Sequence, residues 1–393
     1  MCDSRQNRFK VDKSLCGGLY SSDFMDSKTT GAPQRVRVEL GERSYDIVIG
    51  KGLLSQAAEH LRALKLGKRG VIVTDTNVES RYAGALREAL GKGGITAEVL
   101  SVPAGEASKS LRQAHRLFER LPALGLDRHS FLIALGGGVV GDLAGYVAAC
   151  YLRGIALVQI PTSLLAQVDS SVGGKVGVNL PQGKNLVGAF HQPRLVLADT
   201  DTLTTLPARE LRSGFGEVIK HGAIRDAKFF EWLEREYEQV LALEPDAVAH
   251  VVRRCCEIKA EIVSADERES GLRALLNFGH TLGHAMEALS EYVGLLHGEA
   301  IAMGMCCGAR LSMKRAGMGE ADAKRLQDLI VASGLPTKLG KSYELRELLA
   351  AARLDKKARN GKLRFVLLPR LGEAIISDAV TDADIEEVVN VCR

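Results

Sequence analysis

The sequence has no apolar run of the roughly 18–20 residues that a membrane-spanning helix needs, and it has no long basic run. The formal net charge is only +4, which argues against a nucleic-acid partner. The first 35 residues are polar, carry both charge signs and lack the apolar core of a secretory signal. We therefore expect a disordered extension on a cytoplasmic protein with no membrane partner. A transit peptide is the weaker interpretation because Asp3, Asp12, Asp23 and Asp26 are acidic.

Cysteines are present but are not spaced as a metal or disulfide framework. None of the eight forms a CxxC pair. Two pairs are adjacent in sequence, Cys255 with Cys256 and Cys306 with Cys307, and adjacent residues on a helix point to different faces. We expect small buried side chains in a reducing compartment.

The pattern of apolar residues predicts an α/β fold. With 46% apolar and 25% charged residues, the chain has the balance of a globular protein with a full core. Strand and helix patterns alternate from about residue 36, which favours a Rossmann-like parallel sheet covered by helices. Helical patterns dominate after about residue 203. We predict an extension over residues 1–35, an α/β domain over 36–202 and a mostly α-helical domain over 203–393.

Periodicity also gives the expected elements. Strands are expected at residues 35–40 and 45–49 as a hairpin, and at 71–74, 96–102, 131–135, 156–160, 363–368 and 373–376. Helices are expected between residue 74 and residue 90, and at 111–121, 141–151, 208–223, 227–242, 245–265, 280–289, 297–316 and 321–333.

A glycine loop follows one of the buried strands. GGGVVG at residues 136–141 fits the G-x-G-x-x-G pattern, with a helix after it. Such a loop lets a pyrophosphate approach the backbone N–H groups of a helix N-terminus, although a tight strand-to-helix turn is the alternative. The ordinary fingerprint has an acidic residue at the end of the next strand, but here that strand ends in IPT at residues 160–162. Asp75, at the carboxyl end of an earlier strand, is the candidate for this role.

Four of the nine histidines fall in three short glycine-rich segments. NFGHTLGH places His280 and His284 four residues apart, on one face of a helix. His297 begins the next expected helix, and Glu217 lies upstream in GEVIKH. A carboxylate with two or three imidazoles suits Zn²⁺ or a similar ion with a position open for substrate oxygen. Spacing alone does not decide which of the three histidines is not a ligand.

Several charged and amide side chains lie beside apolar or glycine-rich segments rather than in solvated charge runs. They are Arg153, Asp169, Lys175, Lys184, Asn185, Lys220, Lys259 and Arg273. VDSSVGGK at residues 168–175 is expected to be a loop of small residues, which lets backbone approach an anion. The set suggests a substrate with both phosphate and carboxylate, although surface solvation is the alternative for each lysine alone. DKK at residues 355–357 is better explained as a solvated turn.

Together these segments resemble the dehydroquinate synthase family, within the sugar-phosphate cyclases. The resemblance covers about residues 36–390. It is most specific in GGGVVGDLAGYVAACYLRG, QIPTSLLAQVDSSVGGKVGVN, GKNLVGAFHQP, GEVIKHG, NFGHTLGH and HGEA. It implies an N-terminal NAD-binding α/β domain, a C-terminal helical domain that binds metal and substrate, a site in the cleft between them, and a homodimer.

The resemblance also implies roles for individual residues. The ligands of Zn²⁺ (or Co²⁺) are expected to be Glu217, His280 and His297. NAD is expected to be held by Asp75, Asn77, Glu106, Lys109, Gly137, Gly138, Asp142, Thr162, Ser163 and Lys184, where Ser163 replaces an expected Thr and keeps the hydroxyl. The substrate is expected to meet Arg153, Asp169, Lys175, Asn185, Lys220, Lys259, Arg273, Asn277, His284 and Lys356, with Lys357 as the alternative to Lys356.

The implied reaction is the shikimate-pathway step, in aromatic amino-acid biosynthesis, from 3-deoxy-D-arabino-heptulosonate 7-phosphate to 3-dehydroquinate and phosphate. It combines transient oxidation of the C5 hydroxyl by NAD⁺, phosphate elimination, re-reduction, ring opening and an intramolecular aldol step. The metal would hold the C4 and C5 oxygens, and the cationic side chains would neutralise the leaving phosphate.

Three alternatives remain open at this point. An NAD- and metal-dependent polyol dehydrogenase would give net NADH and would need no phosphate-binding cluster. A cyclase for another sugar phosphate would not call for the carboxylate-binding set of Lys259, Arg273, Asn277 and His284. A non-enzymatic nucleotide- or metal-binding module would not need polar groups from both halves of the chain.

Overall fold

The computed structural model describes residues 32–290, 294–340, 343–354, 358–359 and 362–393, and Pro33–Arg393 form one compact unit. Most of the expected extension over residues 1–35 therefore lies outside the described residues, as do Lys356 and Lys357. The first strand begins at Gln34, so the last two residues of the expected extension belong to the sheet. No helix in the described ranges is long and apolar enough to cross a membrane.

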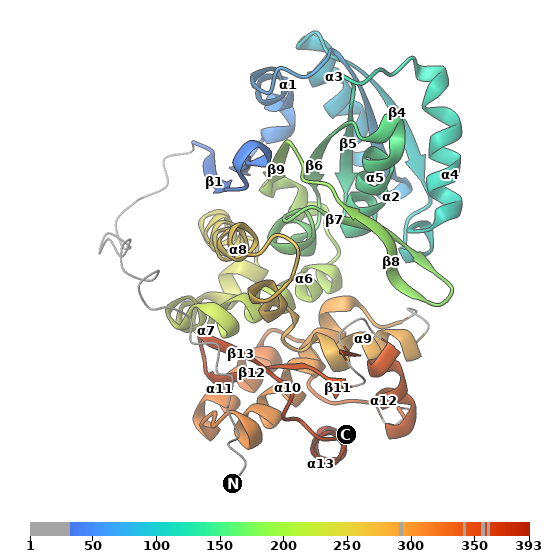
Figure 1. Cartoon of the computed structure of the whole chain (residues 1–393). Helices are drawn as coiled ribbons and strands as arrows, with labels where there is room; N and C mark the ends of the chain where they lie inside the picture. The colour runs from blue at the N-terminus through green and yellow to red at the C-terminus, as the bar shows by residue number, and fades with distance from the viewer. Residues whose placement is uncertain (1–31, 291–293, 341–342, 355–357, 360–361) are drawn as a thin grey trace. The chain divides into compact units, whose positions relative to one another are not determined.

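A seven-stranded sheet occupies the first half of the chain (Figure 1). In spatial order its strands are β1 (Gln34–Val38), β2 (Tyr45–Gly50), β9 (Leu195–Asp199), β6 (Ala156–Pro161), β5 (Phe131–Gly136), β3 (Arg69–Asp75) and β4 (Thr96–Val102). β1 pairs with β2 as the expected antiparallel hairpin, and all other neighbours are parallel. The α/β prediction is confirmed.

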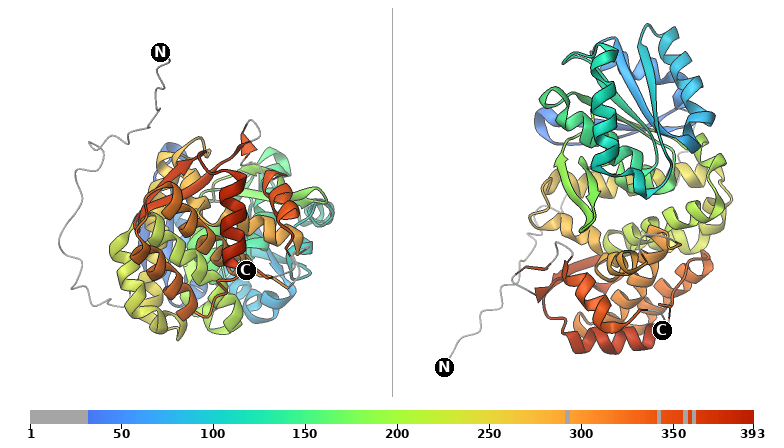
Figure 2. Two further views of the ribbon diagram at one scale, coloured as in Figure 1. Left: turned by 90° about the horizontal axis from the view of Figure 1, so that it is seen from below. Right: turned by 90° about the vertical axis from the view of Figure 1, so that its right-hand side faces the viewer.

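Helices cover both faces of this sheet (Figure 2). Ile72 of β3 packs in one cluster with residues of α1 (Leu53–Ala63) and α3 (Gly84–Lys92). The preceding residue, Val71, packs in another cluster with residues of α4 (Leu111–Arg120) and α5 (Gly138–Cys150). Successive strand residues point to opposite faces, so the uninterrupted apolar run of β3 reflects a strand buried on both sides.

The second half is mostly helical, as predicted. Its helices are α6 (Ala208–Arg225), α7 (Ala227–Leu241), α8 (Pro245–Ala265), α9 (His280–Leu289), α10 (His297–Arg315), α11 (Glu320–Ala332), α12 (Leu345–Leu354) and α13 (Asp382–Cys392). A small hairpin of β12 (Phe365–Arg370) and β13 (Glu373–Ser377) accompanies them. Helix α10 contributes Met305 to one apolar cluster and Cys307 to another, so it is buried on several sides. The division into domains at residues 202 and 203 stays a prediction.

The expected loop at residues 168–175 is wrong in part. Its start lies in η7 (Ala166–Ser170), a turn of π-helix, and Lys175 begins β7 (Lys175–Leu180). β7 pairs with β8 (Gly183–Phe190) in an antiparallel hairpin that was not expected. A Cβ on Gly188 would lie 2.3 Å from the backbone oxygen of Val176, so glycine is required because the two strands approach closely.

Candidate functional site

The glycine loop and Asp75 meet at one edge of the sheet. The chain passes from β3 outward to β4 and then returns to the other side of β3 as β5. Ligands of open α/β sheets bind outside the carboxyl ends of the strands at such a reversal. Asp75 ends β3, and Gly136 ends β5 just before α5. This edge is therefore the candidate nucleotide site.

Contacts at this edge fit a bound dinucleotide. A Cβ on Gly138 would lie 3.0 Å from the hydroxyl of Ser170, so a side chain there would crowd the N-terminus of α5. The Asp75 carboxylate accepts hydrogen bonds from the backbone N–H of Asn77 at 2.8 Å and of Val78 at 3.1 Å. The buried Thr162 donates its backbone N–H to Gly136 at 3.0 Å. The backbone N–H groups at the N-terminus of α5, beside glycines without a Cβ, are the donors that a pyrophosphate requires.

Lys109 carries a buried charge beside this edge. Its ammonium group pairs with Asp142 in α5. Burial alone would lower the pKa of Lys109, but the charges of Asp142 and Glu106 outweigh it and raise that pKa. The carboxylate of Glu106 in turn accepts a hydrogen bond from Asn179 at 2.7 Å. Expected nucleotide residues from several elements thus form one charged network.

The expected metal ligands converge from three helices. Oε1 of Glu217 in α6 lies 3.2 Å from Nε2 of His297 in α10 and 3.4 Å from Nε2 of His280 in α9. The imidazoles of His280, His284 and His297 bring ligand atoms within 4.8 Å of one another. Glu217 with His280 and His297 fits this geometry, and the three histidines together also lie close enough to share an ion.

Hydrogen bonds on the far side of the imidazoles fix their orientation. Nδ1 of His280 donates to the backbone oxygen of Phe278 at 3.0 Å, and Nδ1 of His297 donates to Glu287 at 3.1 Å. Both Nε2 atoms then face Glu217. Histidines that bind metals are commonly held in this way by a carbonyl or a carboxylate.

The electrostatics of this cluster favour a cation. Burial, with the charge of Lys220, lowers the pKa of His280 to about 3, so this imidazole is neutral. Burial would also lower the pKa of His297, but the carboxylates of Glu287 and Glu217 raise it to about 10. His280 thus offers a neutral nitrogen, and two carboxylates favour positive charge at His297, a combination that suits Zn²⁺ or Co²⁺.

Glycines bring the three helices close enough for this convergence. A Cβ on Gly298 would lie 1.7 Å from the backbone oxygen of Ser213 in α6. A Cβ on Gly304 would lie 2.0 Å from the backbone oxygen of Gly279, which precedes α9. Glu217 lies about one helical turn after Ser213, and His280 and His297 are the sequence neighbours of Gly279 and Gly298. The motif glycines therefore serve the packing of helices that carry the ligands.

Asp169 gathers the next group of expected residues. Nζ of Lys259 in α8 lies 2.8 Å from its carboxylate and donates to its backbone oxygen at 2.5 Å. Nζ of Lys220 in α6 lies 3.8 Å from the same carboxylate and also contacts Glu217. Burial alone would raise the pKa of Asp169, but Lys259 and Lys220 outweigh it and lower that pKa. Lys220 therefore joins the substrate residues to the expected metal ligands.

Lys175, Arg273 and Asn277 lie around the carboxylate of Glu269, which the motifs did not single out, and the backbone of Gly173. Lys175 pairs with Glu269, and Asn277 donates to the same carboxylate at 2.8 Å. The Arg273 guanidinium donates to the backbone oxygen of Gly173 at 2.9 Å. Glu269 was missed because it lies in the charged run DERES, residues 266–270, which is typical of a solvated turn.

A second missed residue is Glu287, which bonds His297 and lies 2.9 Å from Nζ of Lys184. It follows His280 by seven residues in α9, which is two helical turns. That spacing places both side chains on one face of the helix, so the sequence does contain a signal for it. Asn185, next to Lys184 in β8, donates its backbone N–H to Asn179 at 2.9 Å.

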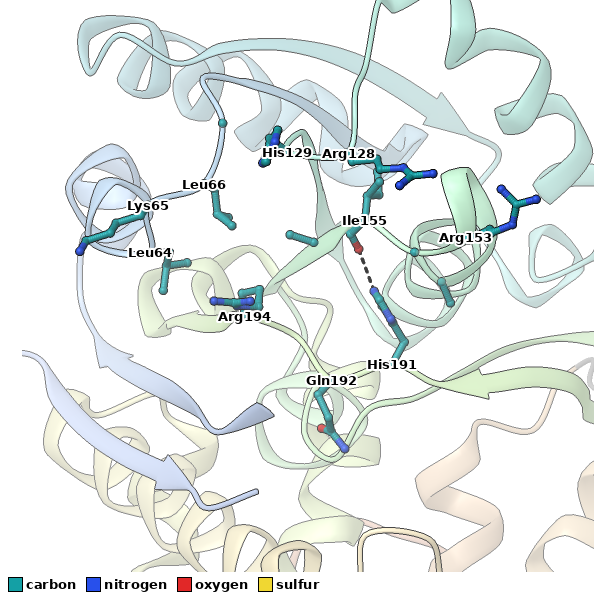
Figure 3. A pocket seen from close by; sticks show the side chains of 14 residues that line it. Leu64, Lys65, Leu66, Arg128, His129, Arg153, Ile155, His191, Gln192 and Arg194 are labelled. Carbon is teal, nitrogen blue, oxygen red and sulfur yellow. Dashed lines mark hydrogen bonds between the residues drawn. The ribbon is translucent and has the colours of Figure 1, made fainter. Parts of the chain in front are cut away.

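Arg153 is not brought to the other expected residues. It precedes β6 and lines a cavity of about 490 Å³ with Arg128 and Arg194, which precede β5 and β9 (Figure 3). In a parallel sheet these amino ends lie opposite the carboxyl ends where Asp75 and the glycines meet. Among the described residues that line the cavity, Arg153 alone belongs to the expected site.

Family models match most of the described fold. Residues 99–213 match the N-terminal part of 3-dehydroquinate synthase, and residues 214–358 match its C-terminal part. The chain belongs to the 3-dehydroquinate synthase family. The family expected from the motifs is thereby confirmed.

Relatives of this member of the 3-dehydroquinate synthase family align with nearly the whole chain. The 3-dehydroquinate synthase of Desulforamulus reducens is 50% identical over 355 residues, which are 90% of this chain and 99% of the relative. The 2-epi-5-epi-valiolone synthase of Streptomyces hygroscopicus subsp. jinggangensis 5008, solved with NAD⁺ and Zn²⁺ bound, has a TM-score of 0.83 at 31% identity and covers 90% of this chain and 98% of its own. A 2-deoxy-scyllo-inosose synthase complexed with carbaglucose-6-phosphate, NAD⁺ and Co²⁺ has a TM-score of 0.83 at 28% identity over 92% of this chain and 100% of its own.

Proposed function

We propose that the protein is a 3-dehydroquinate synthase that converts 3-deoxy-D-arabino-heptulosonate 7-phosphate to 3-dehydroquinate and phosphate. The observation that carries the proposal is the convergence of Glu217, His280 and His297 beside the cationic residues around Asp169. The 50% identity to the D. reducens enzyme supports the same activity. With this activity, the protein would be a phosphate-eliminating carbon–oxygen lyase of the shikimate pathway.

The chain offers separate places for the two cofactors. Asp75, Gly137 and Gly138 would hold NAD at the carboxyl edge of the sheet, with Lys109, Asp142 and Lys184 as charged neighbours. Glu217, His280 and His297 would hold Zn²⁺ or Co²⁺. When bound, NAD supplies a reversible hydride acceptor, and the metal supplies a Lewis acid that stabilises an alkoxide.

The residues around Asp169 would bind and orient the sugar acid. Asp169 is ionised, because Lys259 and Lys220 lower its pKa against the effect of burial, so it can accept a hydrogen bond from a substrate hydroxyl. Each lysine ammonium has three donors, and those that face neither Asp169 nor Glu217 remain for substrate oxygens. Burial excludes water around Lys220, which is 1% exposed, and strengthens its charge interactions.

Lys175 and Arg273 would receive the anionic groups of the substrate. Lys175 has a side chain that is 46% exposed, so its ammonium is accessible from solvent. The Arg273 guanidinium is buried and presents a planar fork suited to a carboxylate or phosphate. Preorganised cations at a leaving phosphate stabilise the charge that develops as the carbon–oxygen bond breaks. Asn185, Asn277 and His284 would add hydrogen bonds to sugar oxygens.

A phosphate-release assay tests this function. Purified protein is offered the heptulosonate phosphate and several other sugar phosphates, before and after chelator treatment, while absorbance reports NADH. We expect phosphate release from the heptulosonate phosphate, stimulated by NAD⁺ and without net NADH. Release should stop after chelation and return with Zn²⁺ or Co²⁺.

Other outcomes of this assay identify the alternatives. Steady NADH accumulation without phosphate release would mean a dehydrogenase. Release only from a different sugar phosphate would mean a cyclase of another specificity. The homodimer and the cytoplasmic location also remain predictions, and sedimentation of the purified protein measures the first.

A further inference from the structure

Glu287 is a buried carboxylate to which the proposed reaction gives no task. It lies in α9 and is only 2% exposed. Oε1 lies 2.9 Å from Nζ of Lys184 in β8, and Oε2 lies 3.1 Å from Nδ1 of His297 in α10. Its two oxygens therefore bond two residues with different proposed roles, one in holding NAD and one in holding the metal.

The contacts of these two partners extend the path in both directions. Nζ of Lys184 lies 3.7 Å from Oε1 of Glu106, another expected nucleotide residue. Nε2 of His297 lies 3.2 Å from Oε1 of Glu217, an expected metal ligand. Acidic and basic groups thus alternate from the nucleotide residues to the metal residues, with Glu287 at the centre.

Burial makes the position of Glu287 well defined. Both carboxylate oxygens of Glu287 are paired, one with Lys184 and one with His297, at a position that is only 2% exposed. A carboxylate at this depth is stable only while its oxygens stay paired. Any shift at one oxygen is therefore opposed by the bond at the other.

We propose that Glu287 is a positioning residue that couples metal binding to NAD binding, an inference that rests on the proposed function. A metal at His297 fixes the imidazole, the imidazole fixes Glu287, and Glu287 holds Lys184 in place for the nucleotide. The side chain of Lys184 is then already ordered, so NAD binding costs less conformational entropy. Because the coupling of two binding events is reciprocal, NAD raises the affinity for metal by the same factor.

The experiment measures both affinities on protein stripped of metal and nucleotide. NAD is titrated by calorimetry with and without saturating Co²⁺, and Co²⁺ is titrated by its visible absorption with and without NAD. For the unaltered protein we expect Co²⁺ to lower the NAD dissociation constant by about fivefold or more. In Glu287→Gln and in Lys184→Met this ratio should fall close to one, and the double variant should show no further loss.

Glu299→Gln is the matched control. Glu299 also bonds the start of α10, where it accepts a hydrogen bond from the backbone N–H of Leu296 at 2.9 Å. Its other partner is Arg209, at 2.7 Å, which belongs to neither expected binding set. A general disturbance of the start of α10 would appear in this variant, whereas we expect it to keep the ratio of the unaltered protein.

Each outcome separates this inference from the proposed function. Glu287→Gln that binds both ligands with the ratio unchanged would overturn the coupling role. If that variant does not fold, Lys184→Met carries the test, since Lys184 is 23% exposed on a hairpin, and an unchanged ratio there overturns the role equally. Failure of the unaltered protein to bind either NAD or Co²⁺ would instead contradict the proposed function.

Discussion

Gly298→Ala should damage the metal site without touching a ligand. The added Cβ would lie 1.7 Å from the backbone oxygen of Ser213, whereas real Cβ atoms stay beyond 3.0 Å. Helix α10 must therefore move from α6 by about 1.3 Å, the difference between these two distances. His297 precedes Gly298 and faces Glu217 across that contact at 3.2 Å. Metal–ligand distances tolerate only about 0.2 Å, so the move separates the ligands.

We expect the Co²⁺ affinity of this variant to fall by about 10–100-fold, as when residues that support metal ligands are altered. Overpacking of about 1–3 kcal/mol should also lower the melting temperature by roughly 1–4 °C for a protein of this size. Co²⁺ titration followed by visible absorption gives the first quantity, and differential scanning fluorimetry gives the second.

Gly84→Ala is the matched control for that substitution. Gly84 begins α3 with φ −62°, and a Cβ there would meet nothing within 4 Å. Alanine should leave Co²⁺ affinity unchanged and stabilise the protein by up to about 1 kcal/mol. Parental metal affinity and melting temperature in Gly298→Ala would refute the role assigned to the contact between α6 and α10.

Two further predictions concern Lys175 and Asp266. Lys175→Ala should lower kcat/KM for phosphate release by about 100-fold or more. The melting temperature should stay nearly constant, because the pair of Lys175 with Glu269 is partly exposed and such pairs add little stability. An unchanged rate would remove Lys175 from the site. Burial would raise the pKa of Asp266, but hydrogen bonds from the backbone N–H groups of Arg273 and Ser270 lower it to about 2. Because the folded pKa is depressed, this stabilisation is present above the unfolded value of about 3.9 and is lost as the pH falls through about 2. Asp266→Asn should therefore flatten the pH dependence of the melting temperature between about pH 4 and 2, and an unaltered dependence would contradict the assignment.

Much of the fold could be predicted because apolar residues recur along the chain with the periods of helices and strands. The helix expected at residues 245–265 is α8 (Pro245–Ala265), and the strand expected at residues 96–102 is β4 (Thr96–Val102). The hairpin of β7 and β8 was missed, and both strands contain glycine, at Gly177 and Gly188, a residue that is depleted in strands. Their role depends on how near the partner strand lies, and that distance is set by tertiary packing.

The site was predictable where residues share a motif. Glu217, His280 and His297 lie in three motifs of unusual composition, and the structure brings them within hydrogen-bonding distance. Glu269 carries no such signal, since only the fold brings it to Lys175. Arg153 shows the opposite difficulty, because a motif position says nothing about which edge of the sheet a side chain occupies.

The contacts of Asp169 have a consequence for motion. Lys259 grips both its carboxylate and its backbone oxygen, while Lys220 approaches from a second helix. Asp169 lies in η7, which follows β6, whereas both lysines lie on helices of the second half. A displacement of the sheet against these helices would therefore break three contacts to one residue.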